Sequence, residues 1–139
     1  MKRRDAIFDR RALKEKLFIN QQMQSVGALN SELQKLEDMR QKLSDMAADS
    51  APKTQDQTAF TLRSSAELNY QIRDQLETAS NRSDHLSQEL QFMRQKIALS
   101  DRRREKSASK AEKIRRTNRD EREARLEDDD ASRRKSCPR

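Results

Sequence analysis

Glycine, proline and cysteine are scarce in this sequence of 139 residues, which has one glycine, two prolines, one cysteine and no tryptophan. So little glycine and proline argues against a flexible linker. A single cysteine, Cys137, cannot form an intramolecular disulfide, so nothing here indicates an oxidising compartment. Valine occurs once and aromatic residues make up 4% of the chain, which argues against β-sheets.

Apolar residues are also few. They make up 32% of the chain, whereas charged residues make up 40%. Globular domains typically contain about 45–50% apolar and about 25% charged residues. This chain has too little apolar surface to fill a round core, but enough for a narrow seam between long helices. The abundant alanine, leucine, glutamate, glutamine, lysine and arginine are good helix formers and agree with that solution.

Apolar side chains recur at alternating steps of three and four residues in two stretches, which is the pattern of a coiled-coil seam. The first stretch comprises Ile19, Val26, Leu29, Leu33, Leu36, Leu43 and Ala47, and Gln22 and Arg40 hold its two polar positions. Phe8 and Ala12 extend this stretch towards the start of the chain, where Leu13, Leu17 and Phe18 widen it. The second comprises Ile72, Leu76, Ala79, Ser83, Leu86, Leu90, Met93 and Ile97, with Leu62 and Leu68 before it. The pattern predicts an all-α, antiparallel two-helix coiled-coil hairpin.

The two stretches are separated by a segment rich in Asp, Ser and Thr around Pro52, which cannot occupy a helix interior. Thr54 or Asp56 is expected to cap the following helix. We therefore expect a single elongated hairpin over 1–139. Its parts are a first helix at 5–48, a turn at 49–57, a second helix at 58–128 and a disordered tail at 129–139.

A turn centred near residue 53 predicts the register of the two helices. It places Leu36 near Tyr70, Leu29 near Leu76 and Phe8 near Ala98. Beyond Ser100 larger apolar residues almost vanish, yet glycine is absent. This predicts a long polar C-terminal helical overhang, which becomes ordered when a partner binds.

Positive charge is concentrated towards the two ends of the chain. The net charge is +4 in residues 1–20, −2 in 21–60, zero in 61–100 and +5 in 101–139. An antiparallel hairpin gathers the two basic segments at one end. Such an end suits an acidic protein, nucleic acid or an anionic membrane, although a merely solvated helix surface has the same composition.

The sequence offers no constellation typical of an enzyme or a metal site. His85 is the only histidine, and neighbouring carboxylates such as Glu37 and Asp38 need a water-excluding pocket to act as acid and base. Gly27 is alone, so there is no phosphate-binding loop, and its place within a helix suggests a slight bend or a close helix approach. The methionines are expected to fill gaps in the seam, or to form a Met-rich binding surface. We therefore expect no enzyme activity, no cofactor and no metal.

No apolar segment follows Lys2, Arg3 and Arg4, so no secretory signal is expected, and no apolar run approaches the roughly 20 residues of a membrane span. We expect a cytoplasmic protein. A leucine-zipper DNA-binding protein is disfavoured, because the most basic segment follows the seam and carries many acids.

Three features together resemble the FliJ family of flagellar type III export proteins. They are the basic first helix, the turn near Pro52 followed by Phe60-Thr61-Leu62, and the charged run from Lys110 to Arg116 leading to an acidic cluster and a basic tail. The resemblance implies a short coiled-coil stalk, similar to the γ subunit of rotary ATPases, whose paired termini enter the export ATPase ring. Its other surfaces would contact the membrane export gate and export chaperones. The resemblance also implies a role in flagellum biogenesis, protein transport and motility, and a location in the cytoplasm or at the periphery of the inner membrane.

Carried onto this chain, the resemblance implies that the basic end docks onto the ring. The docking residues would be Arg3, Arg4, Arg10, Arg11, Arg102, Arg103, Arg104, Lys110 and Lys113. The alternatives are a basic coiled-coil scaffold that associates with itself through Gln22, Arg40 and Ser83, and a nucleic-acid-associated protein.

Overall fold

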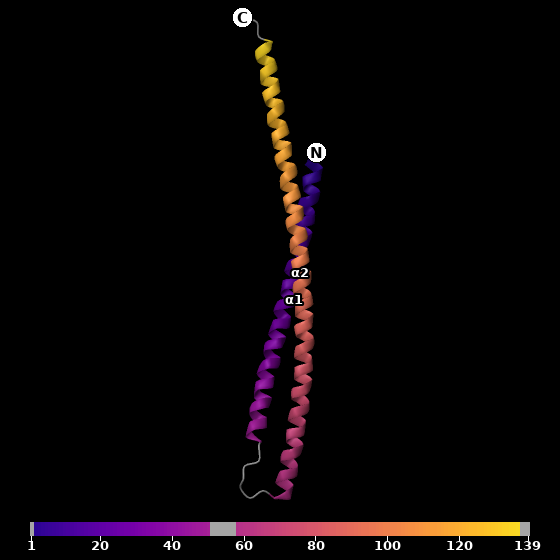
Figure 1. Ribbon diagram of the computed structural model, residues 1–139, viewed down its shortest axis with the longest axis vertical. Coiled ribbons are helices and arrows are strands. Elements are labelled where there is room, and N and C mark those ends of the chain that lie inside the picture. Colours follow the sequence, from indigo (N-terminus) through magenta and orange to yellow (C-terminus); the bar gives the residue numbers. More distant parts are fainter. Residues whose placement is uncertain (1, 51–57, 137–139) are drawn as a thin grey trace. The chain divides into compact units, whose positions relative to one another are not determined.

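The computed structural model describes residues 2–50 and 58–136, and it contains two long helices (Figure 1). Helix α1 spans Lys2–Asp49, with 48 residues, and helix α2 spans Ala59–Lys135, with 77 residues. The described residues contain no strand. The prediction of an all-α helical hairpin is therefore confirmed.

The helix boundaries differ from the predicted ones mainly at the carboxyl end. Helix α2 continues to Lys135, so the predicted end at 128 and tail from 129 are seven residues too early. The basic last turn, Arg133, Arg134 and Lys135, is favourable at a helix carboxyl end and supports the extension. The predicted turn at 49–57 falls mostly on residues 51–57, which lie outside the described residues, as do the predicted caps Thr54 and Asp56.

Thr58 caps α2. Its hydroxyl oxygen accepts a hydrogen bond of 3.4 Å from the Thr61 amide, and its carbonyl accepts bonds from the Thr61 hydroxyl at 2.8 Å and the Leu62 amide at 3.1 Å. A threonine at the N-cap provides an acceptor for amides that have no partner within the helix. Thr58 is therefore the N-cap residue, and α2 begins at the next residue, Ala59.

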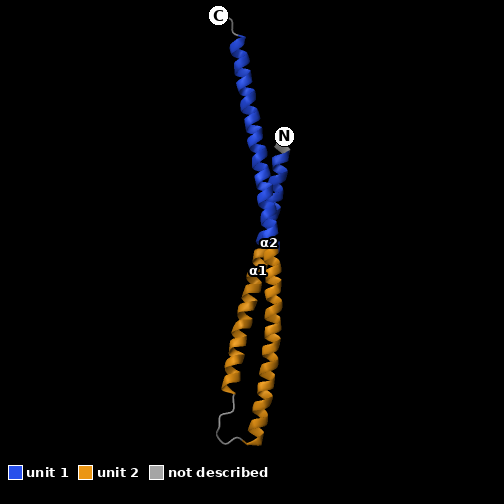
Figure 2. Ribbon diagram, viewed as in Figure 1, with its two compact units in different colours: residues 1–21, 96–139 blue, residues 22–95 orange. Residues whose placement is uncertain are grey.

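The chain divides into two compact units, which Figure 2 shows in blue and orange. Unit 2 comprises residues 22–95 and contains most of the buried apolar side chains. Leu86 is only 1% exposed and Ile72 3% exposed. Every described position of unit 2 that was predicted to lie in the seam is buried or half-buried, in both helices. The heptad prediction is thus confirmed here, including its polar positions Gln22, Arg40 and Ser83.

Two contacts fix the register of unit 2 and correct the predicted one. The Ser50 hydroxyl donates a hydrogen bond of 2.7 Å to Asn69 Oδ1, and Arg82 forms an ion pair of 2.9 Å with Glu32. Because Asn69 lies ten residues after Ala59, the first turns of α2 run beyond the end of α1. The heptad frame then places Leu29 level with Leu90, and the predicted pairing of Leu29 with Leu76 is wrong.

Tyr70, which the same prediction placed near Leu36, is 74% exposed. Leu62 and Leu68 are also exposed, at 49% and 42%, because this part of α2 has little of α1 opposite it. The apolar face predicted for this segment is therefore not buried.

Unit 1 comprises residues 1–21 and 96–139, and its seam differs in chemistry. Its fully buried residues in the described part are Ala111, at 0% exposed, and Ser100, at 4%. Phe8, Ala12 and Ile19 of α1 are half-buried, as expected for predicted seam positions, and so is Glu15, which was not predicted to lie in the seam. Small and polar side chains thus take the buried positions of unit 1, and its large apolar seam residues are only half-buried.

The helices of unit 1 are paired much further along α2 than predicted. Asp9 forms an ion pair with Arg115, and the Phe8 ring lies under the Lys110 ammonium, not beside Ala98. Half-buried positions continue at regular steps through Ile114 to Asn118, whereas residues 119–136 are all exposed. The overhang is therefore about residues 119–135, and the prediction that it begins after Ser100 is wrong.

Two smaller expectations also change. An added Cβ at Gly27 would have no atom within 4 Å, so the glycine does not permit a close helix approach. Leu13 and Leu17 do not widen the seam, because they are 57% and 55% exposed.

Candidate interaction surface

The nine predicted docking residues all belong to unit 1. Arg4, Arg10 and Arg11 lie on exposed positions of α1, and Arg102, Arg103, Lys110 and Lys113 on exposed positions of α2. Arg3 lies in α1, but its side chain is outside the described part of the structure. Arg104 differs from the others: it is half-buried in the seam and bonds Asp101 at 2.8 Å and 2.9 Å.

Unit 1 is strongly basic. In the sequence it contains 23 Lys and Arg against 13 Asp and Glu, a net charge of +10, whereas unit 2 contains eight against eleven, a net charge of −3. Within unit 1 the positive charge belongs to the paired segments, with +4 in residues 1–21 and +6 in 96–118. The overhang 119–136 has six basic and seven acidic residues, a net charge of −1. The basic surface is thus the two-helix part of unit 1.

Phe8 connects cations from both helices. The Arg11 guanidinium lies 5.9 Å from the centroid of the Phe8 ring, and the Lys110 ammonium lies 5.6 Å from it. Cations within about 6 Å of a ring face are attracted by its quadrupole. This contact orients Arg11 and Lys110 on the same side of the seam. The sequence placed Phe8 in the seam but gave no indication that two cations would flank it.

Asp9 and Arg115 join the helices on the other side of the seam. The Arg115 guanidinium donates a hydrogen bond to Asp9 Oδ2, and Glu112 lies 3.5 Å from its second nitrogen. The hydrogen bond and the charge of Asp9 raise the pKa of Arg115 above its usual value. Arg115 was not among the predicted site residues, because identifying it requires the corrected register.

Asp5, at the start of α1, lies in a groove lined by Arg115, Asn118, Arg119 and Arg122. Asp5 Oδ1 is enclosed and accepts no hydrogen bond within the described residues. The groove belongs to the same side of unit 1 as the Asp9–Arg115 pair. Acidic and basic side chains alternate there, so this side presents a mixed charge.

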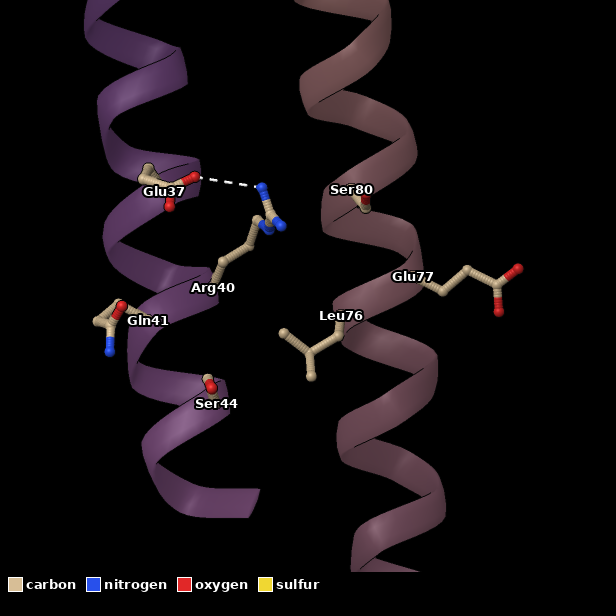
Figure 3. Close-up of a pocket in the computed structure, with 7 residues that line it drawn as sticks. All are labelled: Glu37, Arg40, Gln41, Ser44, Leu76, Glu77 and Ser80. Carbon is tan, nitrogen blue, oxygen red and sulfur yellow. Dashed lines mark hydrogen bonds and ion pairs between the residues drawn. The ribbon is translucent and has the colours of Figure 1, made fainter. Parts of the chain in front are cut away.

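Unit 2 contains a different kind of groove, around the polar seam position Arg40 (Figure 3). Arg40 extends between the helices towards α2, where Leu76 and Ser80 line the same space, and its guanidinium pairs with Glu37 of its own helix at 3.2 Å. Glu77 points away from α1. Nothing in this arrangement brings a nucleophile and a base together.

No group of three or more His, Cys, Asp or Glu in the described ranges 2–50 and 58–136 is arranged to hold a metal ion. Neither α1 nor α2, over the residues described, contains a stretch long and apolar enough to cross a membrane.

These observations define the chain as a helical hairpin with one strongly basic unit, unit 1, and one weakly acidic unit, unit 2. None of the family models, curated proteins and solved structures compared with this chain matches it.

Proposed function

We propose that the chain is a non-catalytic coiled-coil component of the flagellar type III export apparatus, a stalk that associates with the export ATPase and escorts export chaperones. The observation that supports this function best is the segregation of charge. The nine docking residues implied by the family resemblance gather in unit 1, whose paired segments carry the net positive charge.

The geometry of unit 1 suits insertion into a protein ring. Two packed helices with an interaxial distance of about 8–10 Å form a narrow shaft, and α2 continues alone over about 17 further residues, or roughly 25 Å. The basic surface complements an acidic ring lining, and such complementarity speeds association and suppresses wrong partners. The export gate and export chaperones remain the other proposed partners, at the cytoplasmic face of the inner membrane.

Co-purification with the hexameric export ATPase and stimulation of its ATP turnover test this function. The variant Arg11→Glu, Lys110→Glu and Lys113→Glu is expected to lose both effects. The matched control Lys35→Glu, Lys42→Glu and Arg63→Glu makes the same charge change on exposed positions of unit 2 and is expected to retain them. The proposal fails if the unmodified chain, at stoichiometric excess, neither binds the ATPase nor changes its turnover.

The charge of +10 on unit 1 also favours a second candidate, a coiled-coil protein that associates with nucleic acid. Binding through phosphates alone predicts an affinity for any duplex that falls steeply as salt rises. A gel-shift titration at low and moderate salt measures this, and a duplex that is not retarded at low salt rules the candidate out.

A further inference from the structure

One side of unit 1 combines cations with exposed apolar side chains, and none of the helix positions that form it holds an acid, although Glu15 and Glu105 border its grooves. Its residues repeat at steps of seven along each helix, so they share one face. We call this the basic–apolar face, and its members are Arg4, Ile7, Arg11, Lys14 and Phe18 of α1 with Leu99, Arg103, Lys106, Lys110 and Lys113 of α2. The six acidic residues of 1–21 and 96–118 all lie at other helix positions: Asp5, Asp9, Glu15, Asp101, Glu105 and Glu112.

Two sets of contacts show that both helices contribute to this face. Arg11 and Lys110, from different helices, lie over the same Phe8 ring. Lys14, Phe18 and Arg103 line a common groove together with the seam residues Glu15 and Ser100. The Asp9–Arg115 pair lies across the seam from them.

The apolar members of the face lie outside the seam and are exposed. Ile7 is 49% exposed, Leu99 is 53% exposed and Phe18 is 37% exposed. Leu99 also lines a groove with the cations Arg103 and Lys106, and Glu105 borders the same groove. Isolated exposed apolar residues are common, but here Ile7 and Phe18 of α1 and Leu99 of α2 lie on the same face as the cations. The face therefore offers charge and hydrophobic contact to the same partner.

We propose that the basic–apolar face binds the surface of a membrane that contains anionic phospholipids. Cations near such a surface are attracted to the headgroups, and long Lys and Arg side chains keep their charge in water while apolar neighbours enter the acyl boundary. A nucleic-acid backbone would use the cations but leaves Ile7 and Leu99 without a role. In this arrangement the paired helices of unit 1 lie along the bilayer surface.

Vesicle flotation with the full chain tests this inference, using phosphatidylcholine vesicles with and without about 30% phosphatidylglycerol at about 0.1 M salt. We expect binding only to the anionic vesicles. The variant Lys14→Glu, Arg103→Glu and Lys106→Glu is expected to bind at least about tenfold more weakly. The control Arg10→Glu, Lys16→Glu and Arg116→Glu makes the same change in net charge at exposed positions off the face, and its affinity should stay within about twofold.

A second pair of variants tests the apolar contribution. Ile7→Ser with Leu99→Ser removes apolar side chains of the face, whereas Leu13→Ser with Leu17→Ser removes two equally exposed leucines from elsewhere on α1. The first variant is expected to weaken vesicle binding about fivefold or more, and the second to leave it unchanged. All four replaced side chains are 49–57% exposed, so the fold is retained, which circular dichroism verifies.

Hydrogen exchange of the unmodified chain provides a measurement that needs no variant. Anionic vesicles should slow exchange in 4–18 and 99–113, but not in 59–93. Absence of vesicle binding, or equal losses in the face and control variants, overturns the inference. A third outcome also overturns it. The chain would bind a DNA duplex but not vesicles, and Ile7→Ser with Leu99→Ser would leave the DNA affinity unchanged, because the cations would then bind phosphates alone. No ATPase is present in these assays, so their outcome is independent of the proposed export function.

Discussion

Arg40 occupies a seam position at which neighbouring layers hold leucine. Its guanidinium turns back to Glu37 on its own helix, at 3.2 Å, and it makes no ion pair with α2 within the described residues. A surface pair of this kind contributes at most about 1 kcal/mol, while the half-buried position gives up apolar contact with Leu76. The position thus weakens the hairpin, and polar seam residues are known to specify register at such a cost.

We therefore expect Arg40→Leu to raise the free energy of unfolding by about 1 kcal/mol, because apolar area replaces a partly solvated charge. Urea titration followed by circular dichroism measures the change. Gln24→Leu, at an exposed position of the same helix, serves as the control and should alter stability by less than about 0.5 kcal/mol. A lower stability in Arg40→Leu would mean that the guanidinium makes favourable contacts across the helices.

Gly27 lies inside α1 with open space around the position of its missing Cβ. Glycine in a helix interior costs about 1 kcal/mol relative to alanine, through the greater freedom of the unfolded chain. Gly27→Ala should therefore raise the free energy of unfolding by about that amount, measured in the same titration. An unchanged or lower stability would indicate that the backbone needs glycine here for a reason other than space.

At the scale of the helices, the seam changes from leucine layers in unit 2 to small and polar layers in unit 1. Leu43, Leu86 and Leu90 are buried in unit 2, whereas Ala111 and Ser100 are the fully buried residues of unit 1 in the described part. Apolar burial stabilises by about 25 cal/mol per Å², so the small side chains of unit 1 contribute less per layer. The pairing of α1 with α2 in unit 1 is accordingly the weaker one.

This difference predicts a gradient of hydrogen exchange along α1. Amides in 5–20 should exchange through local opening, at least about tenfold faster than amides in 29–43, which should exchange only through global unfolding. Mass spectrometry of peptides from the native chain measures both segments in one experiment. Equal protection throughout α1 would contradict the assigned difference between the two seams.

The sequence predicted the helices and their seams but not their register, and the reason is physical. The heptad spacing from Ile19 to Ala47 and from Ile72 to Ile97 is a local property, and these positions are buried or half-buried as expected. Register depends on where α1 meets α2, and the hydrogen bond of Ser50 to Asn69 shows that α2 begins well before the meeting point.

The same limit applies to the candidate site. The basic residues could be identified from composition, but their arrangement into the basic–apolar face depends on which α2 residues lie beside Phe8. Lys110 does, and Ala98, the predicted neighbour, does not. The observed pairing differs from the predicted one by about three helical turns. Residues 101–118, which were predicted to overhang, therefore pair with α1 and form half of the basic paired surface.

For the molecule as a whole, charge and seam chemistry both make the pairing of the helices weaker in unit 1 than in unit 2. The most basic unit, with a net charge of +10, is also the unit with the fewest buried apolar side chains in the described part. Cations on adjacent helices about 10 Å apart repel one another at low salt, where the screening length is about 10 Å or longer. The Asp9–Arg115 pair opposes this repulsion but is a single exposed interaction.

Raising the salt concentration from about 0.05 M to about 0.5 M should therefore stabilise unit 1, because screening weakens the net repulsion more than it weakens one ion pair. We expect hydrogen exchange in 5–20 and 99–115 to slow severalfold, while exchange in 29–43 of the nearly neutral unit 2 changes little. Sodium chloride suits the measurement, since sulfate strengthens hydrophobic burial in both units. Faster exchange in unit 1 at high salt would show that attraction between its helices outweighs repulsion. Its cations would then be held chiefly by neighbouring acids and be less free to meet an external partner.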